Sequence, residues 1–103
     1  MIIKKNLEPL FYLKEQVENG THGNNVMEVE FSDNKRNLLH IFDGDDTGYT
    51  PMITLSVESQ EKINGRWRKI GQKDILTCHY EFFVKNCGEG LYQKIIRTLT
   101  EEP

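Results

Sequence analysis

The chain has 103 residues, of which 37% are hydrophobic and 28% are charged, and its formal net charge is −3. That length predicts one domain, spanning residues 1–103, with a single modest core. The acidic balance argues against a protein that holds nucleic acid mainly through phosphate contacts, because such proteins usually carry a basic surplus.

No run of the sequence approaches the roughly 20 apolar residues that a membrane-spanning helix needs. The N-terminus lacks the longer apolar run and the small residues of a signal peptide. We therefore expect a cytoplasmic protein that makes no membrane contact, in which Cys78 and Cys87 are reduced thiols and not a disulfide.

Residues 6–18 are predicted to form an N-terminal helix, because their apolar residues recur at helical spacing. Asn6 is a suitable N-cap, and Pro9 falls in the first turn, where a missing N–H costs little. Residues 91–100 show the same apolar spacing and predict a C-terminal helix.

Three segments between these helices are predicted to be strands: 26–32, 38–42 and 52–58. In the first of them apolar and polar residues alternate, which is typical of a strand with one buried and one solvated face. Residues 43–51 are rich in Asp and Gly and are predicted to form a loop.

Asn64 and Gly65 give the strongest local turn signal, because both accept the positive φ values of a type I′ turn. Residues 57–63 and 66–70 are therefore predicted to pair as a hairpin. Its polar composition predicts that it projects past the core. Gly71 is expected to bend or end its second arm.

Residues 75–84 are open to two interpretations. Their β-branched and aromatic composition favours a strand, whereas a helix capped by Asp74 would also place apolar residues on one face. We predict a strand.

The order of elements, α-β-β-β-β-(β)-α, predicts an α+β fold. We expect a two-layer sandwich, in which an N-terminal and a C-terminal helix cover a four- to five-stranded, mainly antiparallel sheet. An open, barrel-like sheet is the alternative. Edge strands of an open sheet invite pairing, which favours a homodimer.

Asp43, Asp45 and Thr47 follow the spacing of the first half of a calcium-binding EF-hand loop. The twelfth position of such a loop is a bidentate Glu, but here it is Thr54, and the flanking segments are predicted to be strands. A plain connecting loop is therefore favoured. A weak cation site, and an acidic protein-docking loop that includes Asp46, are the alternatives.

The hairpin concentrates three cations and the one Trp of the chain in four consecutive residues: Arg66, Trp67, Arg68 and Lys69. In a strand, Arg66 and Arg68 share one face and Trp67 points to the other. Because Trp is highly buried on average, we expect Trp67 to pack on the core. Stacking on a base and insertion into a partner protein are the alternatives.

No enzyme signature surrounds Cys78. A nucleophilic Cys needs a base within hydrogen-bond reach, but His79 would point to the opposite face of a strand, and His40 would reach Cys78 only from an adjacent strand. The cysteines and histidines lack the short spacing of a zinc site. We therefore expect no enzymatic activity, no cofactor and no zinc site.

By elimination, the sequence predicts a small protein-interaction domain that binds through the 43–48 loop, the Trp67 hairpin, or both. By analogy with small acidic accessory proteins of phages and mobile elements, it would inhibit or modulate a host protein. The first alternative is a nucleic-acid-binding module that uses the hairpin cations together with Lys73. The second is a domain that binds a small molecule or a cation at the 43–48 loop.

Overall fold

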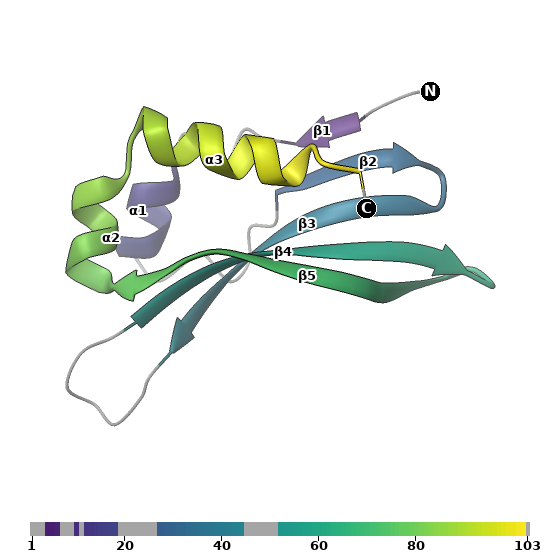
Figure 1. Ribbon diagram of the computed structural model, residues 1–103, viewed down its shortest axis with the longest axis horizontal. Helices are drawn as coiled ribbons and strands as arrows, with labels where there is room; N and C mark the ends of the chain where they lie inside the picture. Colours follow the sequence, from purple (N-terminus) through teal and green to yellow (C-terminus); the bar gives the residue numbers. More distant parts are fainter. Residues whose placement is uncertain (1–3, 7–9, 11, 19–26, 45–51, 103) are drawn as a thin grey trace.

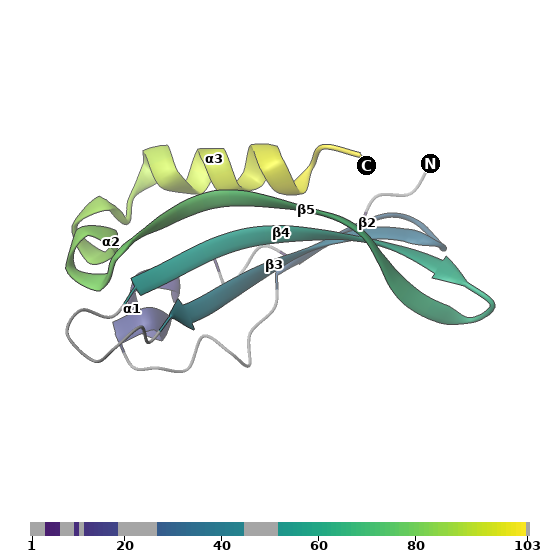
Figure 2. The ribbon, with the colours of Figure 1, turned by 60° about the horizontal axis from the view of Figure 1, so that its bottom comes forward.

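The computed structural model describes residues 4–6, 10, 12–18, 27–44 and 52–102. Its strands form one antiparallel sheet, in which neighbouring strands are also successive strands along the chain. Helix α3 lies along one face of this sheet (Figures 1 and 2). The elements are β1 (Lys4–Asn6), α1 (Leu13–Glu18), β2 (Glu28–Ser32), β3 (Lys35–Gly44), β4 (Met52–Ile63), β5 (Arg66–His79), α2 (Tyr80–Asn86) and α3 (Glu89–Leu99).

The predicted α+β class and the antiparallel sheet are confirmed. The predicted N-terminal helix is confirmed only in its second half, and residues 7–9 and 11 of its predicted range lie outside the described residues. Asn6 itself is not helical. It lies in β1, where its backbone is paired with that of Glu28, and α1 begins at Leu13. Pairing with β2 gives the polar backbone groups of β1 partners, and this tertiary contact overrides a local helix preference.

One hydrophobic cluster joins the described helices to the sheet. Leu13 of α1, Phe83 of α2 and Ile95 of α3 have no exposed surface. They pack with alternate residues of the strands, among them Val29 and Leu55, which are also fully buried. The described part of the chain therefore has one core, in which the helices share a single face of the sheet.

The hairpin predicted around Asn64 and Gly65 is confirmed, since their φ values are 53° and 81°. Its arms are longer than predicted, because β4 has 12 residues and β5 has 14. Gly71 does not end β5. It is paired with Ser59, directly beside a register irregularity of the kind that bends a strand.

The strand predicted for residues 75–84 is right as far as His79 and wrong beyond it. Met52, the first residue of β4, pairs with His79, so a longer β5 would find no further backbone partner among the described residues. The chain turns into α2 at Tyr80 instead, and this helix places Phe83 in the core. Propensity favoured a strand, but the length of the neighbouring strand decides where β5 ends.

The predicted C-terminal helix is confirmed as α3, which begins two residues earlier than its apolar spacing indicated. Its buried residues, Ile95 and Leu99, face the sheet. Within the described residues, none of the helices combines the length and the apolar character needed to cross a membrane.

Candidate functional site: the hairpin end

The part of the β4–β5 hairpin formed by residues 60–70 is called here the hairpin end. It lies beyond the last turn of α3, so the helix does not cover it (Figures 1 and 2). It holds one acid and four cations, although the whole chain is acidic. These charged residues are Glu61, Lys62, Arg66, Arg68 and Lys69.

The strand register divides the side chains of the hairpin end between two faces. Directly opposite residues of antiparallel strands share a face. One face therefore carries Ile63 with its partner Arg66, and Arg68 with its partner Glu61. The other face carries Trp67 and the remaining cations, Lys62 and Lys69. Arg66 and Arg68 thus share a face opposite to that of Trp67, as predicted.

Trp67 does not pack on the core, and the prediction that it does is wrong. It is half-buried and lies outside the hydrophobic cluster. The Arg36 guanidinium carbon lies 4.1 Å from the centroid of its ring, and the Lys62 ammonium nitrogen 5.7 Å. Trp67 falls on the polar face of β5, so it buries its ring beneath two cations. Each such contact contributes about 0.5–1 kcal/mol at an exposed site.

Arg36 is held in place by further contacts on this polar face of the sheet. Its Nε donates a 2.8 Å hydrogen bond to Oε1 of Gln60, and its Nη1 lies 3.7 Å from a Glu28 carboxylate oxygen. Gln60 in turn donates to Glu58. Sequence reasoning missed Arg36, because it is distant in sequence and only the register of β3 with β4 brings it to Trp67.

Two isoleucines of the hairpin end are exposed, Ile63 by 42% and Ile70 by 47%. Ile63 lies directly across from Arg66. Among the described residues, no carboxylate forms an ion pair with Arg66 or Arg68. The hairpin end thus exposes apolar and cationic groups side by side, and the described part of the chain does not neutralise these arginines.

The other predicted docking and cation site, the 43–48 loop, lies largely outside the described residues. Asp45, Asp46 and Thr47 fall there, while the backbone of Asp43 belongs to β3 and is paired with Ile53. Within the described ranges, no three His, Cys, Asp or Glu side chains are grouped as a metal site requires. A role for this loop stays a prediction.

The geometry around Cys78 does not favour a nucleophile. Cys78 pairs with Ile53 and packs against the core, whereas His40 pairs with Ser56 and lies on the opposite, polar face. Burial raises the pKa of the Cys78 thiol, which lowers its reactive thiolate fraction. His40 stacks on Phe42 instead, with ring centroids 5.7 Å apart.

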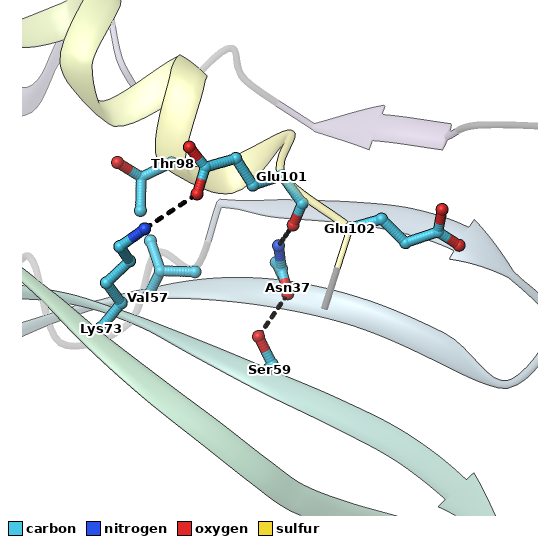
Figure 3. A pocket seen from close by; sticks show the side chains of 7 residues that line it. All are labelled: Asn37, Val57, Ser59, Lys73, Thr98, Glu101 and Glu102. Carbon is cyan, nitrogen blue, oxygen red and sulfur yellow. Dashed lines mark hydrogen bonds and ion pairs between the residues drawn. The ribbon is translucent and has the colours of Figure 1, made fainter.

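A pocket of about 190 Å³ lies where the end of α3 meets the sheet (Figure 3). Its polar groups already satisfy one another. The Asn37 amide donates to the carbonyl oxygens of Leu99 and Glu101, at 2.9 and 2.8 Å, and its own oxygen accepts from Ser59 at 2.8 Å. The Lys73 ammonium lies 2.9 Å from the Glu101 carboxylate. These contacts fasten the helix end to the sheet and leave Asn37, Ser59 and Lys73 engaged with protein groups.

The chain matches no protein-family model, no curated protein and no solved structure. Its candidate site therefore depends on geometry alone. Among the surfaces that the structure describes, the hairpin end combines projection, exposed apolar groups and unneutralised charge.

Proposed function

We propose that this chain is a protein-binding domain and that the hairpin end is its contact surface. The observation that carries the proposal is the exposure of Ile63 and Ile70 together with Arg66 and Arg68 on a projecting hairpin. Arg is one of the residue types most enriched in the energetic centres of protein interfaces. Exposed isoleucines beside these arginines add apolar area that a partner protein would bury.

Nucleic acid is a poorer fit to the same surface. A base that stacked on Trp67 would compete with Arg36 and Lys62, whose charged groups lie over its ring. A phosphate backbone also offers nothing apolar to cover Ile63.

The finer predictions stay predictions: that the domain has no enzymatic activity, that it is cytoplasmic, and that it inhibits or modulates a host protein as phage accessory proteins do. The same holds for a homodimer and for docking by the 43–48 loop. The proposed binding at the hairpin end does not depend on any of these predictions.

The test is a capture experiment in a lysate of the source cells, read by mass spectrometry. The bait is the full chain, compared with the double variant Arg66→Glu/Arg68→Glu. The control is Lys85→Glu/Lys94→Glu, which changes the charge equally at exposed positions on α2 and α3. Circular dichroism establishes that all three proteins are folded.

We expect one partner to be retained by the wild type and by the control, and its yield to fall on the order of tenfold with the hairpin variant. A partner retained equally by all three would move the binding surface away from the hairpin end. A folded bait that retains nothing above background contradicts the proposal.

A further inference from the structure

We infer that the partner presents an extended acidic segment, with two carboxylates two residues apart that meet Arg66 and Arg68 and an apolar neighbour that covers Ile63. This inference rests on the proposed function and adds the chemistry of the partner. It concerns the face of the hairpin end opposite Trp67, where the register places these three residues together.

The first step is spacing. Arg66 and Arg68 are alternate residues of one strand, so their side chains leave the same face about 6.6–6.8 Å apart along the strand. An extended segment running alongside presents its own alternate side chains at that spacing. A Glu-x-Glu sequence would therefore match both arginines, whereas two adjacent Glu residues in a strand would point to opposite faces.

The second step is charge. Glu61 is the one acid of the hairpin end, and the register places it between Lys35 of β3 and Arg68 of β5. One carboxylate thus faces two cations, with Arg66 as a third on the same face. Arginine binds carboxylates with two parallel hydrogen bonds, which favours a carboxylate partner whose position is fixed.

The third step is the apolar contact that distinguishes a protein from other anions. Ile63 is 42% exposed and directly opposite Arg66, so a group that binds Arg66 also comes close to Ile63. A polypeptide can offer an apolar side chain next to a carboxylate. A nucleic acid offers phosphates here without an apolar side chain, so the surface fits an acidic protein segment better.

The test measures the binding of labelled synthetic peptides to the full chain by fluorescence anisotropy. The first peptide alternates Glu with Val and Thr, and the second has the same composition with its Glu residues consecutive. A short DNA duplex and a single-stranded oligonucleotide are measured beside them. The protein variants are Arg66→Ala/Arg68→Ala and Ile63→Ser, with Lys85→Ala/Lys94→Ala as the control of equal charge change.

We expect the alternating peptide to bind more tightly than the consecutive one and than either nucleic acid. The double arginine variant should weaken this binding on the order of tenfold. Ile63→Ser should weaken it by about threefold, because less apolar area is buried on binding, and the control variant should leave it unchanged. Binding should also fall as salt is raised, because the charges are exposed.

Equal affinity for the two peptides would overturn the Glu-x-Glu match, and tighter binding of either nucleic acid would overturn the choice of a protein partner. If a partner is captured through the hairpin end but neither peptide binds at millimolar concentration, this inference fails and the proposed function stands. If the lysate yields no partner, the proposed function itself fails, whatever the peptides do.

Discussion

The same two strands, β4 and β5, pass through two different environments. In the half covered by helices, alternate residues of β4 such as Ile53, Leu55 and Val57 are buried at 2% exposure or less. Farther along the same face, beyond the end of α3, β4 carries Glu61 and the exposed Ile63. The backbone pairing is continuous, and what changes is whether a second layer lies over the side chains.

This difference separates stability from recognition. In the covered half, burial of large apolar side chains provides the main stabilising free energy. The hairpin end has its backbone pairing, a favourable turn and cation contacts on Trp67, each of which contributes little. Substitutions there should therefore alter binding more than folding, and substitutions in the covered half should do the reverse.

The sharpest test of this contrast is Phe83→Ala. Phe83 has no exposed surface, so we expect the free energy of unfolding to fall by about 3–5 kcal/mol through lost burial and a new cavity. Urea denaturation followed by circular dichroism measures the change. The matched control is its neighbour Phe82, which is 54% exposed; Phe82→Ala should change stability by less than about 0.5 kcal/mol. Similar losses of stability for Phe83→Ala and Phe82→Ala would contradict the claim that burial in the covered half stabilises the fold.

Asn37→Ala tests the boundary between the two regions, where the end of α3 is fastened to the sheet. The change leaves the carbonyl oxygens of Leu99 and Glu101 and the Ser59 hydroxyl without their partner. We expect a loss of about 1–3 kcal/mol, again by urea denaturation. The exposed Asn34 supplies the control, since Asn34→Ala should have little effect. A loss below about 0.5 kcal/mol would mean that the hydrogen bonds of Asn37 do not stabilise the fold.

Trp67→Ala should lower stability by about 1–2 kcal/mol, below the effect of Phe83→Ala, although Trp is the larger residue. The reason is that its ring is covered by Arg36 and Lys62 and not by the core. Thermal and urea denaturation measure the effect, and Trp67→Phe should recover part of it. A loss as large as that of Phe83→Ala would show that the hairpin end belongs to the stabilising core.

The smallest expected effect is a pH dependence at Asp74, on the polar face of β5. A 2.6 Å hydrogen bond from Ser56, and then one from Gln72, hold the pKa of Asp74 below its ordinary value of 3.8. Because the folded pKa is the lower one, the carboxylate stabilises the fold above pH 3.8 and loses this contribution as pH falls through the folded pKa.

Asp74→Asn should therefore flatten the decline of the unfolding free energy as pH falls below about 5, and the other acids should account for the decline that remains. Denaturation at a series of pH values provides the measurement. An unchanged pH profile in this variant would mean that the Ser56 contact does not favour the charged form.

The sequence predicted those features that depend on neighbouring residues. Asn64 and Gly65 fixed the hairpin because their backbone preferences are local, and the apolar spacing of Ile95 and Leu99 located α3. Prediction from the sequence failed where contacts between residues distant in sequence determine the structure. The end of β5 follows from where β4 begins, and the strand at Asn6 follows from pairing with β2.

The same distinction between local and distant contacts applies to the candidate site. Alternation along one strand was enough to place Arg66 and Arg68 on one face. The surroundings of Trp67 required the register of three strands, because Arg36 comes from β3. No local pattern marks Arg36 as part of this surface, so sequence reasoning had no means of finding it.

The agreement between strand order in the sheet and strand order along the chain also bears on how the molecule folds. From β2 to β5, pairing of successive strands needs closure of short connections, which is fast, whereas contacts between distant residues form more slowly. The hydrogen bond from Asn37 to the Leu99 carbonyl joins residues 62 positions apart. We expect the hairpins to form early and the docking of α3 to complete the fold, so that the hairpin end takes its shape before the core closes.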